Sequence, residues 1–83
     1  MVATHELTIA AKCPHGPDDT YLATFRTNRM IPCEVVLEAV RVLTISPVYQ
    51  ESLTATLADV LQCEVELRGT HTGVKTTTKA GTA

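Results

Sequence analysis

The sequence predicts an α+β domain in which a four-stranded antiparallel sheet carries a helix pair on one face, in the order β-β-α-α-β-β. Residues 4–12 and 20–27 alternate apolar and polar side chains, which is typical of half-buried strands. Residues 33–43 and 47–61, separated by a break at 44–46, repeat apolar side chains every three or four positions, which is typical of amphipathic helices. Residues 63–68 and 74–79 return to strand-like composition, so all 83 residues are interpreted as one domain.

The first two predicted strands form a hairpin with a long connection. Residues 13–19, CPHGPDD, contain two prolines, a glycine and two aspartates, which is the composition of a loop. The side chains expected to face the core from the two strands are Leu7, Ile9, Ala11, Tyr21, Ala23 and Phe25.

Two helices are predicted to follow. Pro32 suits the first turn of one helix, and Ser46 with Pro47 suits the N-cap and first turn of the next. The expected buried stripes are Cys33, Val36, Leu37, Val40 and Leu43 in the first helix, and Tyr49, Leu53, Leu57, Val60 and Leu61 in the second.

The C-terminal part is predicted to form a second strand pair. Residues 63–68 alternate, with Cys63, Val65 and Leu67 facing inward. Residues 69–73 are expected to form a turn region, and residues 74–79 to form a strand with little apolar cover. The basic residues of this part, together with two upstream arginines, are interpreted either as a phosphate-attracting surface or as charges that protect a sheet edge. They are Arg26, Arg29, Arg68, Lys75 and Lys79.

Composition excludes several classes of protein. The formal net charge of −2 argues against a general nucleic-acid binder. The sequence contains no apolar run near the ~20 residues that cross a bilayer and has no signal-peptide pattern at its start. The three cysteines are widely spaced, which favours reduced thiols and a cytoplasmic location. A short chain with few aromatic residues has a small core, which favours self-association.

The predicted order of elements resembles the tunnelling fold, whose domains assemble as rings of sheets around a central tunnel. Residues 50–54, Gln-Glu-Ser-Leu-Thr, are similar to the Gln-Glu-Arg-Leu-Thr run that starts the second helix of GTP cyclohydrolase I. The following strand leads to a matching histidine, His71, and Cys13-Pro14-His15-Gly16 is similar to the family's Cys-x-His-His motif. The resemblance implies a zinc site, but Gly16 and Gly73 stand at two of its three ligand positions, so the cofactor is left open.

The loop CPHGPDD is also similar to the Cys-Pro and Gly-x-Pro-Asp run of the nitrile reductase of queuosine biosynthesis, with one residue fewer. That resemblance implies that Cys13 attacks a deazaguanine nitrile while Asp18 or Asp19 handles protons. The family's Glu-x-Lys-Ser-x-x-Lys cofactor stretch is absent from the sequence, so NADPH reduction is not implied.

The residue chemistry leaves alternatives open at each candidate position. Glu51 could accept two parallel N–H bonds from a ligand ring, or only favour the positive end of its own helix. Cys13 could be a nucleophile assisted by His15, or an ordinary buried thiol. His71 could act as an acid or base, or lie in a surface turn. Cys13, His15 and His71 together could also form a composite zinc site.

We therefore expect a homo-oligomer that binds a purine- or pterin-like heterocycle between subunits. Gln50 and Glu51 would anchor the ring, and Cys13 would lie near its reactive carbon with His15, Asp18 or His71. As an enzyme it would resemble GTP cyclohydrolase I or a deazaguanine-modifying enzyme. The alternative is a non-catalytic oligomeric scaffold or ligand-binding subunit that kept the fold without the chemistry.

Overall fold

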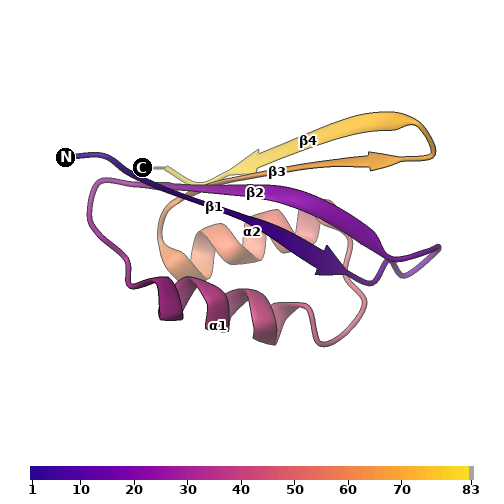
Figure 1. The fold of residues 1–83 in the computed structure, drawn as a ribbon, viewed down its shortest axis with the longest axis horizontal. Coiled ribbons are helices and arrows are strands. Elements are labelled where there is room, and N and C mark those ends of the chain that lie inside the picture. Colours follow the sequence, from indigo (N-terminus) through magenta and orange to yellow (C-terminus); the bar gives the residue numbers. More distant parts are fainter. Residues whose placement is uncertain (83) are drawn as a thin grey trace.

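A computed structural model describes residues 1–82 and confirms the predicted α+β class. The strands are β1 (Ala3–Ala11), β2 (Asp19–Thr27), β3 (Glu64–His71) and β4 (Val74–Ala80), and the helices are α1 (Cys33–Leu43) and α2 (Gln50–Leu61). The strands lie in the order β1-β2-β3-β4 and every neighbouring pair is antiparallel. Both helices lie on the same face of the sheet, and the other face carries no helix (Figure 1).

The core lies between the sheet and the two helices, and both helices contribute buried residues to it. The register places Tyr21 of β2 opposite Ile9 of β1 and opposite Gly69 of β3, so these residues share the helix-facing side. The predicted inward faces of β2 and β3 are confirmed, because Tyr21, Ala23, Phe25, Cys63, Val65 and Leu67 are all buried. The sequence predicted that β4 would have little apolar cover. This is also confirmed, since none of its residues is fully buried.

Arg29 joins the loop after β2 to the end of α2. Its guanidinium donates hydrogen bonds to the carbonyl oxygens of Leu61, at 2.9 Å, and Gln62, at 3.2 Å. These carbonyls end the helix and have no intrahelical donor, and a cation there also suits the negative end of the helix dipole. Gln62 then takes a left-handed conformation with φ of 53°, which turns the chain into β3.

The predicted start of the second helix is wrong by three residues. Helix α2 begins at Gln50, not at Pro47, and Tyr49 precedes it in an extended conformation. The reason is a contact between distant segments, because the Val48 N–H donates to the Lys12 carbonyl oxygen at 2.9 Å. Val48 is therefore held next to Lys12, just after β1, and Tyr49 is extended before the helix starts.

Four residues predicted to lie on buried helix stripes are exposed. Cys33 and Leu37 of α1 face solvent, as do Tyr49 before α2 and Val60 within it. Each helix buries only the narrow side that meets the sheet or the other helix. Cys33 is therefore not the core thiol that its place in the periodic pattern indicated.

The predicted turn region over residues 69–73 is shorter than expected. Strand β3 continues to His71, and only Thr72 and Gly73 form the turn, with φ of 52° and 81°. Two successive positive φ angles are typical of the type I′ turn that closes tight hairpins. His71 is therefore a strand residue with a fixed side-chain direction.

Among the described residues, no helix is both long enough and apolar enough to cross a membrane.

Candidate functional site

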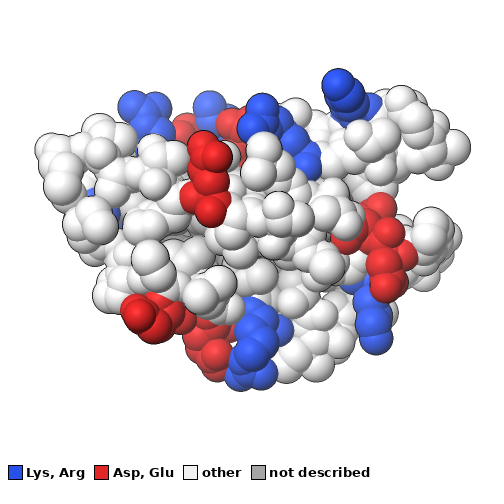
Figure 2. Space-filling model, in the orientation of Figure 1, with Lys and Arg blue, Asp and Glu red and all other residues white. Residues whose placement is uncertain are grey.

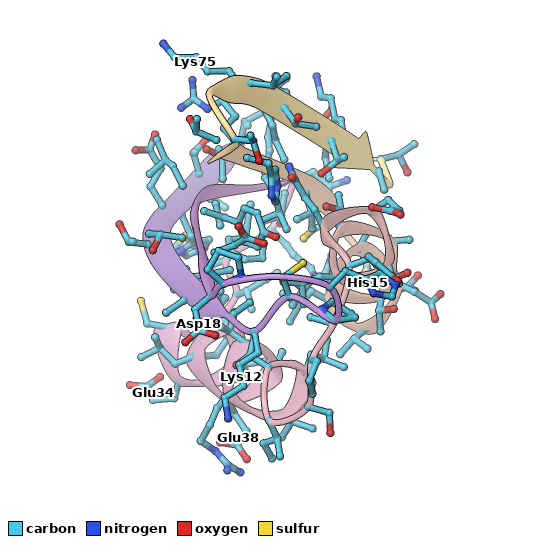
Figure 3. The ribbon with its side chains drawn as sticks, turned by 90° about the vertical axis from the view of Figure 1, so that its right-hand side faces the viewer. Lys12, His15, Asp18, Glu34, Glu38 and Lys75 are labelled. Carbon is cyan, nitrogen blue, oxygen red and sulfur yellow. The ribbon has the colours of Figure 1, made fainter. Side chains whose placement is uncertain are left out.

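The residues singled out from the sequence lie mainly at one end of the sheet. The β1–β2 loop, the start of α2 and the β3–β4 hairpin meet there, and Figure 3 looks onto this end. Lys12 and His15 lie on the loop, with His15 on the side of α2 and Asp18 on the opposite side (Figure 3). The fold thus brings three separate parts of the chain to one place.

Gln50 is the structural anchor of this end. It is the first residue of α2 and only 5% of it is exposed. Its amide nitrogen donates to the carbonyl oxygens of Leu67 in β3 and Thr76 in β4, each at 3.0 Å. Carbonyl oxygens only accept, so the orientation of the amide is fixed and its oxygen must act as an acceptor.

His71 connects that amide to β2. Its Nε2 atom lies 2.9 Å from the Gln50 side-chain oxygen, and its Nδ1 atom lies 3.1 Å from Oδ1 of Asp19. Because the Gln50 oxygen accepts, Nε2 of His71 carries the donated proton. Both contacts are hydrogen bonds at once only when another proton lies between Nδ1 and the Asp19 carboxylate. The His71–Asp19 contact is an ion pair when the imidazole is protonated.

Tyr21 extends the network into the core. Its hydroxyl donates to Oδ2 of Asp19 at 3.2 Å, and its ring centre lies 6.0 Å from that of His71. Burial and the adjacent Asp19 carboxylate raise the pKa of Tyr21 well above its ordinary value. The hydroxyl therefore stays protonated and acts as a donor at neutral pH. We refer to Gln50, His71, Asp19 and Tyr21 as the polar network.

Cys13 and Glu51 border the polar network. Negative charge on either side chain adds smaller contributions that raise the pKa of Tyr21, so both lie within electrostatic reach of its hydroxyl. Cys13 is half-buried and is a free thiol. Glu51 is exposed in the first turn of α2, and no hydrogen bond or ion pair holds its carboxylate among residues 1–82. Cys13 offers a thiol and Glu51 an exposed acceptor group at this end of the sheet.

The other two predicted site residues lie outside the polar network. His15 is exposed on the loop, and its ring packs against Tyr49 with a centroid separation of 5.6 Å. Asp18 is exposed, whereas its neighbour Asp19 turns inward to contact His71 and Tyr21. Of the two aspartates considered from the sequence, Asp19 is the one that the fold brings to the network.

The donors present in one chain do not fit the zinc site that the resemblance implies. In the part of the chain that the structure describes, no three His, Cys, Asp or Glu side chains converge in a way that could hold a metal ion. Gly73 lies in the hairpin turn and Gly16 in the loop, and neither offers a ligand atom. No chemical step is therefore assigned to a metal.

Sequence reasoning missed the part that Tyr21 plays in this site. The alternation of β2 placed Tyr21 in the core but did not show which residue its buried hydroxyl would bond. One signal was available, because Asp19 and Tyr21 are two residues apart and therefore share one face of a strand. A buried hydroxyl next to a carboxylate on the same face indicates a hydrogen bond.

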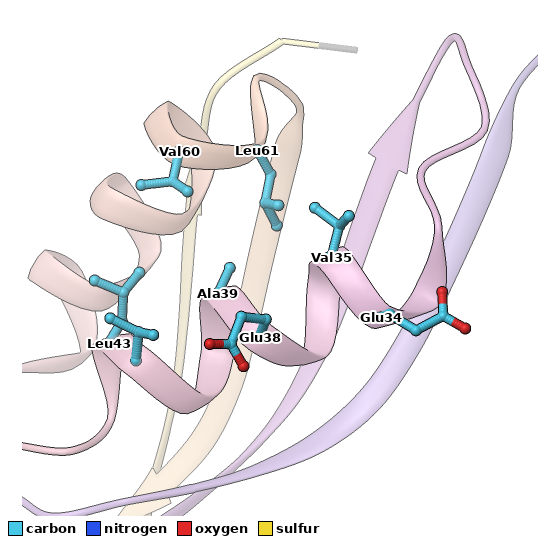
Figure 4. Close-up of a pocket in the computed structure, with 8 residues that line it drawn as sticks. Glu34, Val35, Glu38, Ala39, Leu43, Val60 and Leu61 are labelled. Atoms are coloured by element: carbon cyan, nitrogen blue, oxygen red, sulfur yellow. The ribbon is translucent and has the colours of Figure 1, made fainter.

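A second surface feature lies on the far side of the helices. An apolar groove of about 460 Å³ runs between α1 and α2 (Figure 4). It is lined by Glu34, Val35, Glu38, Ala39, Val42, Leu43, Val60 and Leu61. Val35, Val42 and Val60 are each about half exposed there. Apolar side chains gathered in this way are typical of surfaces that associate with protein. We refer to it as the helix groove.

No protein-family model matches the chain, and no curated protein matches its sequence.

Proposed function

We propose that this protein is a tunnelling-fold subunit that binds a purine- or pterin-like heterocycle in a cytoplasmic homo-oligomer. The observation that carries the proposal is the polar network beside Glu51. Gln50 and His71 fix the start of α2 against β3 and β4, so the exposed carboxylate of Glu51 is presented from a rigid base. Pre-organised groups of this kind reduce the entropy lost on binding.

Glu51 is the residue assigned to hold the ligand ring. The guanidine-like edge of guanine or pterin carries two parallel N–H donors, which match the two oxygens of a carboxylate. Glu51 is solvent-exposed and, within residues 1–82, has no competing cation. Gln50 is assigned a positioning role, because both amide hydrogens and the amide oxygen already have protein partners.

Cys13 is assigned to the reactive side of the ligand. It is a half-buried free thiol on the loop that borders the network, and it could add to an electrophilic carbon of the ligand once deprotonated. His71 uses both ring nitrogens within the protein, so its assigned role is to hold Asp19 and the hairpin in place. His15 and Asp18 remain candidates for proton transfer from the exposed loop.

Assembly through the sheet edges is part of the proposal. Within the described chain, β1 and β4 each have one unpaired edge, and the helix-free face of the sheet is polar. Pairing of β1 with β4 of the next subunit would continue the antiparallel sheet and remove both edges. Such a ring would also supply a second wall to a ligand held by Glu51.

The test is a binding measurement with guanine, pterin and deazaguanine compounds by calorimetry. At least one compound should bind, and Glu51→Gln should weaken it by about tenfold because a neutral amide cannot replace a bidentate carboxylate. Glu34→Gln is the matched control, because Glu34 is also an exposed acid in a first helical turn and should not matter. Absence of binding by all three classes would contradict the proposal.

The helix groove favours a second candidate, a non-catalytic oligomeric scaffold. Its apolar lining would be covered by the same surface of a second copy, since isologous contacts are the commonest form of self-association. Val42→Lys with Val60→Lys should then lower the oligomer size seen in sedimentation. Ile45→Lys should not, because Ile45 is even more exposed but lies outside the groove. A groove variant that assembles normally would contradict this candidate.

A further inference from the structure

We propose that the helix-free face of the sheet carries a separate binding site for a small dianionic phosphate, built by Arg68 and Lys75 with the hydroxyls of Thr70 and Thr77. This site lies on the opposite side of β3 and β4 from the polar network and does not rest on the proposed function. Arg68, Thr70, Lys75 and Thr77 line a hollow of about 290 Å³, together with Leu22 of β2.

The strand register brings these side chains together. Arg68 pairs with Thr77 and Thr70 pairs with Lys75 across β3 and β4, and Leu22 pairs with Arg68 across β2 and β3. Directly paired residues share a face, as do residues two apart on one strand. The four polar side chains therefore stand at the corners of a square with sides of about 5 to 7 Å, which is wide enough to surround one phosphate group.

Within the described chain, the positive charge of this square is only partly offset, by one salt bridge between Arg68 and Glu66. Arg41 pairs with Glu38 at 2.6 Å, Lys79 pairs with Glu64 at 3.4 Å, and Arg29 is bound to helix carbonyls. Arg68 approaches Glu66 only through Nε, at 3.7 Å, and Lys75 has no ion pair in residues 1–82.

The terminal nitrogens of Arg68 therefore remain free to bind an anion. No acidic residue lines the hollow. Lys75 stands out from the hairpin in Figure 3, and Figure 2 shows Lys and Arg side chains along the sheet side of the molecule with acidic side chains between some of them.

The chemistry of the square selects a phosphate group. The planar guanidinium of Arg68 can donate two parallel hydrogen bonds to two phosphate oxygens, and Lys75 adds a second positive charge. The threonine hydroxyls supply further donors at the same height above the sheet. Leu22, 38% exposed at the rim, offers an apolar contact to the organic part of a phosphate monoester. A polymeric nucleic acid is disfavoured by the net charge of −2.

The test is an amide NMR titration of the intact protein with inorganic phosphate, with sodium chloride holding ionic strength constant. Saturable shifts should cluster at Leu22, Arg68, Thr70, Lys75 and Thr77. Arg68→Gln and Lys75→Gln should each weaken phosphate binding by about tenfold, because each removes one charge-assisted contact. Lys79→Gln is the control: Lys79 lies on the same strand and face, and the substitution should change the affinity by less than about twofold.

Three results would overturn the proposal. The first is a linear, unsaturable response, and the second is an equal loss of affinity in the Lys75→Gln and Lys79→Gln variants, which would indicate general charge screening. The third is binding of a short single-stranded oligonucleotide at least about tenfold tighter than a simple phosphate monoester, which would indicate a polymer ligand. If Arg68→Gln gave a poorly dispersed spectrum, the comparison of the two exposed lysine variants would decide alone.

Discussion

His71 and Asp19 lie on the neighbouring strands β3 and β2, with Nδ1 of the imidazole 3.1 Å from Oδ1 of the carboxylate. Asp19 begins β2 and His71 ends β3, while the other nitrogen of His71 reaches Gln50 at the start of α2. One side chain therefore ties two strands and a helix together. This linkage gives Glu51 a fixed base and makes the polar network a source of stability that can be tested separately from function.

Asp19→Ala should destabilise the protein by about 1–3 kcal/mol, because it leaves Nδ1 of His71 and the buried Tyr21 hydroxyl without a partner. Asp19→Asn should cost less, because its amide oxygen can accept from Tyr21 and its amide nitrogen can donate to a neutral imidazole. The free energies of unfolding would be measured with urea.

Asp18→Ala is the internal control for this pair of substitutions. Asp18 is exposed on the same loop and outside the network, so its removal should change stability by less than about 0.5 kcal/mol. Equal effects of Asp18→Ala and Asp19→Ala would show that the loop responds to charge and not to the His71 contact.

Gln50→Ala should be more costly, at about 2–4 kcal/mol, because it removes three hydrogen bonds and leaves the Leu67 and Thr76 carbonyls unsatisfied. Denaturation of this variant should be compared with that of Glu51→Ala, in which the next residue of the same helix turn is exposed. The control should lose no more than about 1 kcal/mol, the usual size of a helix-dipole contribution. A Gln50 variant as stable as the control would contradict the anchoring role.

We expect the free energy of unfolding to fall at alkaline pH because of Tyr21. Its pKa is raised in the folded protein, chiefly by burial and then by Asp19, relative to about 10 in the unfolded chain. Below pH 10 both states hold the proton and this contribution to stability is fully present. Between the two pKa values only the folded state holds it, so stability falls as the pH rises, by about 1.4 kcal/mol per pH unit.

Tyr21→Phe should flatten that part of the pH profile, because phenylalanine has no proton to lose. Urea denaturation at several pH values between about 9 and 11 would show the difference between the two proteins. Other groups titrate in both the wild type and the variant. Burial also raises the pKa of Cys63, so this thiol adds a fall of stability with rising pH to both proteins. Parallel profiles for the wild type and the variant would contradict this role of Tyr21.

The strands could be predicted from the sequence because alternation is a local property, and the inward faces of β2 and β3 follow from it directly. The start of α2 could not be predicted from the sequence. It depends on a hydrogen bond from the backbone of Val48 to that of Lys12, which is far away in the chain. The helix groove was missed for a related reason: periodicity marks Val60 as apolar without showing that nothing in the described chain covers it.

The candidate site was predictable only in part. The motif resemblance drew attention to Gln50 and His71, and the fold places them 2.9 Å apart. Their actual bonding depends on two backbone carbonyls that no sequence pattern reveals. The choice of Asp19 over Asp18 depends on where β2 begins, because a strand residue has a fixed side-chain direction and a loop residue does not.

Gly69→Ala should disturb the polar network from within β3. A Cβ atom at Gly69 would lie 2.6 Å from Cδ1 and 2.9 Å from Cε1 of Tyr21, closer than carbon atoms normally approach. The ring is 1% exposed and packed on all sides, so it cannot move away without disturbing its contacts to Asp19 and His71. The expected cost is about 1–3 kcal/mol, the usual penalty for overpacking a core.

Gly16→Ala is the matched control, because a Cβ atom at Gly16 would meet nothing within 4 Å. For a domain of this size, the expected penalty lowers the melting temperature of Gly69→Ala by about 4 °C or more, whereas that of Gly16→Ala should stay within about 2 °C of the wild type. The NMR signals of the Gly69 variant should shift at Asp19, Tyr21 and His71 if the ring is displaced. A Gly69 variant that melts like the Gly16 variant would show that β3 does not need glycine there. The Tyr21 ring would then be able to move far enough to accommodate the added methyl group.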